Sequence, residues 1–199
     1  HASWNALVKA GADRFSFTVV LTLAECVMGL ALAPFFPMIS AEALPWLLLS
    51  GVLHVGYMLF LTEAYAHGDL AQVYPLARGS APLIVAIVSA LFLREELTAT
   101  RLAAVLCIGL GVVALSLRGG GDVGRIGGKA VANALATACF TAGYTLVDAI
   151  GARASGSASA YTCAMFVLSG AALVAVGFYR RGATALSVDA RVWRLGALA

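Results

Sequence analysis

Six long, mainly apolar stretches constrain this chain more than any other feature of its sequence. They cover residues 15–36, 44–66, 70–93, 98–117, 130–150 and 158–179. A helix needs about 20 mainly apolar residues to cross the hydrocarbon core of a bilayer. Each stretch is therefore predicted to be a transmembrane helix, and the chain to be an all-α, polytopic membrane protein.

Composition supports this prediction. Hydrophobic residues make up 61% of the 199 residues and charged residues 12%, and the mean hydropathy is +0.92. A soluble domain carries about 25% charged residues, so much of this apolar surface must face lipid. The net charge of +3 is spread over short connections, which is not the basic patch of a nucleic-acid-binding protein. No nucleic-acid partner is expected.

The two ends of the sequence have the character of membrane helices. Residues 1–9 have the composition of the last turns of a helix, and another helix is predicted to begin near Trp193. We therefore expect a fragment that is cut inside a membrane helix at each end. A secretory signal peptide is not expected, because no basic segment followed by an apolar stretch stands at the start.

An internal repeat is predicted from two similar segments, residues 1–11 and 141–151. Both contain a small residue, an aromatic residue, an aliphatic pair and a final glycine. Five spans separate equivalent points, and an odd number of crossings inverts the second unit, as in many transporters. The predicted domains are a first repeat at 1–117, a glycine-rich linker at 118–129, and the start of a second repeat at 130–199.

Three motifs carry a resemblance to a known family. They are AHGDLAQVYPLARGSAP at 66–82, FLREELT at 92–98 and GLGVV at 109–113, and HASWNALVK at 1–9 is similar to the end of the family's first helix. Together they resemble the EamA-like families of the drug/metabolite transporter superfamily. The resemblance implies ten helices in two inverted five-helix repeats, and export of metabolites. Arg94 departs from the glycine that the family commonly has before its Glu.

Arg78 is the most distinctive candidate for substrate binding. Tyr74, Pro75 and Pro82 lie close to the same helical face. The prolines are predicted to distort the helix and free carbonyl groups, which a membrane helix tolerates when it lines a cavity. The guanidinium could then hold a carboxylate or phosphate. The alternative is a structural ion pair with Glu25, Glu63 or Asp148.

Three further ionisable residues are candidates for proton coupling, since a charge within a span is costly. Glu25 follows Thr18 and Thr22 on one stripe, His54 lies near the centre of its span, and Glu63 stands four residues before His67. For Glu25 and His54 the alternative is a hydrogen bond between helices. For Glu63 and His67 it is an interfacial pair, which we prefer to transport chemistry.

A polar stripe runs along residues 130–150 and is predicted to match a second stripe in residues 1–9. Its members are Asn133, Thr137, Thr141, Tyr144 and Asp148, and by repeat they correspond to His1, Trp4, Asn5 and Lys9. Two equivalent stripes favour a shared cavity, although such faces also hold helices together. The complete set of cavity candidates is Trp4, Asn5, His54, Tyr57, Tyr74, Arg78, Thr141 and Tyr144.

The sequence contains no motif of an enzyme or of a metal or cofactor site. Its four cysteines have no CxxC spacing. The predicted function is a secondary transporter that exports small metabolites or drugs. Its predicted partners are that substrate and the lipid bilayer, and a homodimer is compatible with the sequence. The alternatives are an intramembrane enzyme or flippase for a lipid-linked substrate, and a scaffold subunit.

The family resemblance and the distribution of basic residues give different expectations for the orientation of the chain in the membrane. The family resemblance implies the bacterial inner membrane, with both termini in the cytoplasm. The positive-inside rule counts nine basic residues on one side of the membrane and three on the other, which would place the start of the first helix outside. The two expectations oppose each other.

Overall fold

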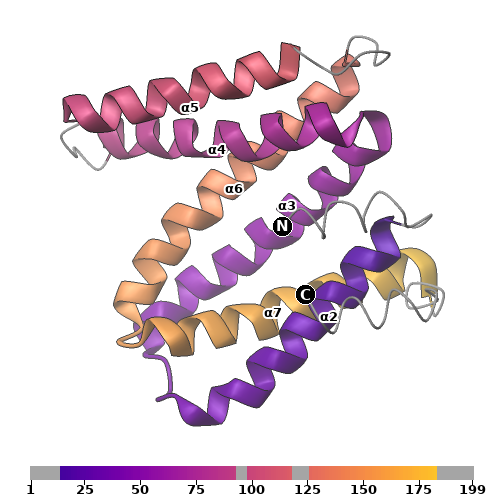
Figure 1. Ribbon diagram of the computed structural model, residues 1–199. Coiled ribbons are helices and arrows are strands. Elements are labelled where there is room, and N and C mark those ends of the chain that lie inside the picture. The colour runs from indigo at the N-terminus through magenta and orange to yellow at the C-terminus, as the bar shows by residue number, and fades with distance from the viewer. Residues whose placement is uncertain (1–13, 93–97, 118–125, 183–199) are drawn as a thin grey trace. The chain divides into compact units, whose positions relative to one another are not determined.

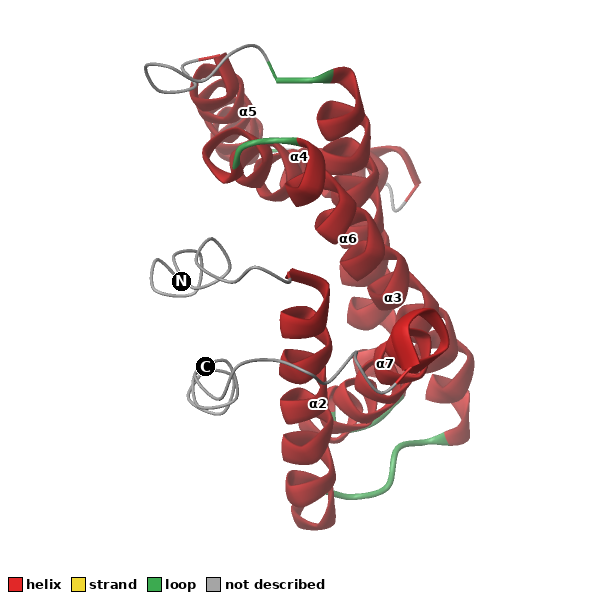
Figure 2. Cartoon of the chain, turned by 90° about the vertical axis from the view of Figure 1, so that its right-hand side faces the viewer, coloured by secondary structure: helices red, strands yellow, loops and turns green. Residues whose placement is uncertain are grey.

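A computed structural model describes residues 14–92, 98–117 and 126–182. The helix expected in residues 1–9, the helix expected from Trp193 onward and most of the linker lie outside these residues. So do the departure at Arg94 and the cavity candidates Trp4 and Asn5. Every regular element in the described part is a helix (Figure 2). This confirms the predicted all-α fold class.

The helices follow the predicted spans closely. The bounds are Arg14–Leu32 for α2, Leu44–His67 for α3, Leu70–Phe92 for α4, Ala99–Leu117 for α5, Gly128–Ala154 for α6 and Ala158–Arg181 for α7. Short 3₁₀ turns cover Ala33–Phe35 and Ala41–Ala43. The helix α6 is longer than the expected 130–150, because a helix can continue with polar residues once it leaves the hydrocarbon. A break comes at Gly156, whose φ of 77° is left-handed.

Five of the described helices are long and apolar enough to cross a membrane, namely α2, α3, α4, α6 and α7. This establishes a multi-pass membrane protein. In α5 the apolar stretch within the described residues is Leu102–Val112, which is shorter. The membrane crossing expected at 98–117 therefore stays a prediction, as does the repeat count.

The chain divides into two compact units. Unit 1 combines residues 1–55 with 147–199, and unit 2 is residues 56–146. Unit 1 thus holds α2, α7, the first part of α3 and the end of α6, whereas unit 2 holds α4, α5 and the remainder of α3 and α6. The predicted repeats at 1–117 and 130–199 are based on sequence similarity and not on contacts, and this division stays a prediction.

In unit 1, α2 packs side by side with α7, and small residues make this possible (Figure 1). A Cβ atom on Gly29 would lie 2.7 Å from the carbonyl oxygen of Cys163, and one on Gly170 would lie 2.5 Å from that of Thr22. The Cys26 thiol lies 3.6 Å from the carbonyl oxygen of Val167. Small residues allow membrane helices to approach until their backbones touch, and this contact depends on two glycines.

A second contact in unit 1 closes the turn between α6 and α7. The Ser40 hydroxyl donates to the carbonyl oxygen of Ala154 at 2.7 Å. Beside it, Ala43 and Leu47 pack with the buried ring of Tyr161. The segment before α3 is thereby fixed to the α6–α7 hairpin.

Unit 2 uses the same kind of close packing. The helices α4 and α5 lie side by side (Figure 1), and a Cβ atom on Gly79 would collide with Val112. Its parts of α3 and α6 are antiparallel, and the rings of Phe60 and Phe140 stack with their centroids 5.3 Å apart. A Cβ atom on Gly56 would meet the Phe140 ring. Glycine on one helix therefore accommodates a large side chain on its neighbour.

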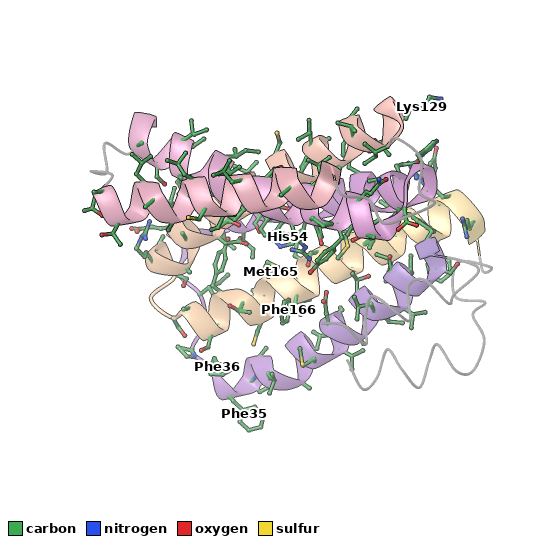
Figure 3. All side chains as sticks on the ribbon, turned by 45° about the horizontal axis from the view of Figure 1, so that its top comes forward. Phe35, Phe36, His54, Lys129, Met165 and Phe166 are labelled. Atoms are coloured by element: carbon green, nitrogen blue, oxygen red, sulfur yellow. The ribbon has the colours of Figure 1, made fainter. Side chains whose placement is uncertain are left out.

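The outer surface of the described helices is apolar. Phe35 is 79% exposed at the end of α2 and projects away from the helices (Figure 3). Exposed apolar side chains also cover α3, α5 and α7, including Val52, Leu106, Leu110 and Phe178. Such a surface suits lipid and not water.

Candidate functional site

Arg78 occupies an unusual position on α4. The helix continues through both Pro75 and Pro82, on either side of Arg78. Each proline removes a backbone donor, so the carbonyl groups of Ala71 and Arg78 lose their usual partners within the helix. Arg78 itself is exposed. An exposed guanidinium within a membrane span requires water or a polar partner.

Tyrosine residues of unit 2 surround this guanidinium. Arg78 donates from Nη2 to the Tyr57 hydroxyl oxygen at 2.6 Å, and its Cζ lies 5.2 Å from the centre of the Tyr57 ring. Tyr144 on α6 packs edge-on against Tyr57, with ring centroids 5.6 Å apart. Tyr65 and Tyr74 also lie in the neighbourhood of Arg78. We call these five residues the Arg78 cluster, and three helices contribute to it.

The Arg78 cluster brings together four of the predicted cavity candidates, Tyr57, Tyr74, Arg78 and Tyr144. Among the described residues of unit 2, no carboxylate lies within ion-pair distance of Arg78. Glu63 lies instead 3.7 Å from His67, and both side chains are well exposed. The positive charge of Arg78 is therefore held in place by a neutral hydroxyl and a ring face, which leaves it able to attract an anion.

His54 belongs to a separate group of polar residues in unit 1. Its Nε2 lies 4.0 Å from Oδ2 of Asp148 on α6, and the two side chains are 16% and 24% exposed. The Tyr161 hydroxyl on α7 donates to Oδ1 of Asp148 at 3.1 Å. The other ring nitrogen of His54, Nδ1, lies 3.0 Å from the Ser50 carbonyl oxygen. We call Ser50, His54, Asp148 and Tyr161 the His54 cluster; in Figure 3 His54 lies among the helices.

The threonine stripe of α6 bonds to its own helix. Thr137 donates to the carbonyl oxygen of Asn133 at 2.7 Å, Thr141 to that of Thr137 at 2.9 Å, and Thr145 to that of Thr141 at 2.7 Å. Thr137 and Thr141 are buried. Bonds of this kind satisfy the hydroxyl without a neighbouring helix. The Thr141 hydroxyl is thus occupied by the backbone.

This arrangement predicts a small effect of Thr141→Val. Valine has nearly the same shape, and the loss of one neutral hydrogen bond costs about 1 kcal/mol. We expect thermal stability and transport close to those of the wild type, measured by unfolding in detergent and by vesicle uptake. Thr145→Val removes an equivalent bond at an exposed position and serves as the matched control. A large loss of transport in Thr141→Val alone would show that the hydroxyl contacts substrate.

Glu25 differs from the other acidic residues in the spans. Thr22, one turn before it, donates to the carbonyl oxygens of Thr18 and Val19, both at 3.1 Å, and not to the carboxyl group. No ion pair or hydrogen bond joins the Glu25 side chain to another residue in the described ranges. Its role in proton coupling stays a prediction.

Sequence reasoning did not identify Ser50, Tyr65 and Tyr161 as members of these clusters. A signal for Tyr161 was available. Asp148 lies eight residues before Gly156 and Tyr161 five residues after it, so both lie on the part of the antiparallel hairpin near its turn. Ser50 stands four residues before His54, on the same helical face. Within the part of the chain that the structure describes, no three His, Cys, Asp or Glu residues lie close enough to hold a metal ion.

The long apolar helices and the Arg78 cluster define a multi-pass membrane protein with a charged group inside one of its spans. A comparison with protein families adds its identity: the profile of the EamA-like transporter family matches residues 1–117. The chain therefore belongs to the EamA-like transporter family, a family of membrane transporters of the drug/metabolite type, as the sequence motifs predicted. Comparison with curated proteins and with solved structures gave no match.

Proposed function

We propose that the protein is a secondary transporter that exports small anionic metabolites or drugs, with Arg78 as the anchor for the anionic group. The observation that carries this proposal is the exposed guanidinium of Arg78, which Tyr57 holds and which has no carboxylate partner among the described residues of unit 2. An arginine inside a span is costly, and a pure structural role would favour an ion pair. The exposed charge instead fits a substrate carboxylate or phosphate.

The transport cycle that we propose is alternating access between two inverted five-helix repeats in the bacterial inner membrane. The tyrosines of the Arg78 cluster would supply hydrogen bonds and ring faces to the remainder of the substrate. Aromatic side chains combine apolar area with a polar end, which suits amphipathic molecules. Trp4, Asn5 and Thr141 remain proposed cavity residues, and Glu25, His54 and Glu63 remain proposed sites of proton coupling.

The experiment that tests this function uses everted membrane vesicles from cells that produce the full-length protein. The vesicles are incubated with a panel of carboxylates, phosphate esters and neutral analogues of the same size, and the accumulated compounds are measured by mass spectrometry. We expect at least one anion to accumulate above the level in vesicles without the protein. Equal accumulation of the neutral analogues, or no accumulation of any compound, would contradict the proposal.

A further inference from the structure

The His54 cluster forms a ring of polar contacts through three helices of unit 1. Ser50 lies near the Tyr161 hydroxyl, Tyr161 donates to Oδ1 of Asp148 at 3.1 Å, and Oδ2 of Asp148 faces Nε2 of His54 at 4.0 Å. Nδ1 of His54 then returns to Ser50, 3.0 Å from its carbonyl oxygen and 3.2 Å from its hydroxyl. The contact between His54 and Asp148, at 4.0 Å, is longer than a hydrogen bond.

The hydrogen positions in this ring follow from the chemistry of its members. The Ser50 carbonyl oxygen can only accept, and it lies nearer to Nδ1 of His54 than the Ser50 hydroxyl does, so we assign a hydrogen to Nδ1. In a neutral imidazole Nε2 is then an acceptor, and it faces the carboxylate of Asp148, which is also an acceptor. Two acceptors that face each other repel. One additional proton, on Nε2 or on Oδ2, converts this contact into an attractive one.

The net charge of the pair leads to the same conclusion. With one additional proton the pair is neutral overall, either as imidazolium and carboxylate or as imidazole and carboxylic acid. Loss of that proton to water leaves one negative charge within a membrane span, and gain of a second leaves one positive charge. Isolated charges are costly in a medium of low dielectric constant. The state with one proton is therefore the stable one, and its proton is the one that can be exchanged.

We propose that His54 and Asp148 form a proton-binding site, which Ser50 and Tyr161 position. Its protonated state joins α3 to α6 and, through Tyr161, to α7. Proton release would weaken the link between α3 and α6, so proton binding is coupled to the packing of these helices. The use of this coupling in transport rests on the proposed function, whereas proton binding itself does not.

The other ionisable groups of unit 1 do not provide this link. Glu25 lies on α2, Glu42 precedes α3, Arg153 follows Asp148 on α6, and Arg180 and Arg181 end α7. Among the described residues, neither carboxylate forms an ion pair with His54 and none of the arginines forms one with Asp148. Tyr161 is the ionisable side chain that α7 directs at Asp148, and it is 2% exposed.

The test is a titration of the histidine side chains in the full-length protein, with the protein in lipid nanodiscs and without substrate. Imidazole nitrogen signals are followed by NMR in histidine-labelled protein, and His54→Gln assigns the His54 signal. We expect His54 to titrate, and Asp148→Asn to move its midpoint by about one pH unit or more, the size of effect that a nearby opposite charge produces. Tyr161→Phe should move it less.

The exposed pair of Glu63 and His67 supplies a matched control. Glu63→Gln removes a carboxylate at similar distance from a histidine on the same helix, and it should leave the His54 midpoint unchanged. If Asp148→Asn fails to fold, two other variants provide the test. In Asp148→Glu we expect His54 still to titrate, and in Tyr161→Phe we expect the midpoint of its titration to shift. A His54 midpoint that is the same in every Asp148 and Tyr161 variant, or a His54 that never titrates while the protein is folded, would overturn the proposal. Neither result depends on whether vesicles transport an anion.

Discussion

Substitution of Arg78 by alanine in the full-length protein is expected to abolish most transport of the anionic substrate while membrane insertion is retained. A hydrogen bond to a charged group contributes about 1.5–3 kcal/mol, which corresponds to a loss of about 10- to 100-fold in affinity. The variant should therefore need a much higher substrate concentration for the same uptake. Uptake by everted vesicles, normalised to the protein content of the membrane, measures this loss.

Two further variants make the Arg78 result specific. Arg78→Lys keeps the positive charge but loses the planar fork of donors that binds a carboxylate at two points, so it should restore part of the transport. Arg153→Ala removes an exposed arginine near the end of α6 and should leave transport unchanged. Wild-type uptake by Arg78→Ala would show that the arginine is not the anchor.

The second large effect is expected for Gly170→Leu, which should prevent α2 and α7 from packing. Even a Cβ atom at this position would lie 2.5 Å from the Thr22 carbonyl oxygen, and a backbone atom cannot rotate away. Overpacking of a close contact costs about 1–3 kcal/mol and sometimes more. We expect a lower unfolding temperature and less monodisperse protein, measured by fluorescence-detected size-exclusion chromatography after heating.

Gly111→Leu is the matched control for this substitution. Gly111 also lies within a helix, but no atom of a neighbour stands within 4 Å of a Cβ built there. The leucine would extend into open space, and the stability should match that of the wild type. Equal unfolding temperatures for the Gly170 and Gly111 variants would mean that the backbone contact between α2 and α7 does not stabilise the protein.

The positions of the helices could be predicted from the sequence because the membrane itself sets their length. The helix expected at 44–66 is observed at Leu44–His67, and the one expected at 70–93 is described as Leu70–Phe92. The short connection of Gly68 and Asp69 between them is too polar to enter the hydrocarbon. A chain that must satisfy every backbone group within the bilayer has few alternatives to the helix, so a hydropathy pattern is sufficient for this part of the fold.

The partners of the polar residues could not be predicted in the same way. A stripe on one helix shows which residues share a face, but it does not show what that face meets. Asp148 is an example, because within unit 1 it lies beside His54 and accepts a hydrogen bond from Tyr161. The Thr141 hydroxyl likewise bonds to the backbone of its own helix, which its position on the stripe does not show. The contact between Asp148 and His54 is made between helices that are far apart in the sequence, so a pattern within one helix does not reveal it.

The glycine contact between α2 and α7 has a consequence for the order in which the protein is made. Cys26 and Val167, which meet in this contact, are 141 positions apart in the chain. During synthesis α2 therefore enters the bilayer well before α7 exists, and its glycine face first meets lipid. Helices in membranes insert individually and associate afterwards. Unit 1 can consequently assemble only after the translocation machinery has released α7, which makes this pairing a late step of biogenesis.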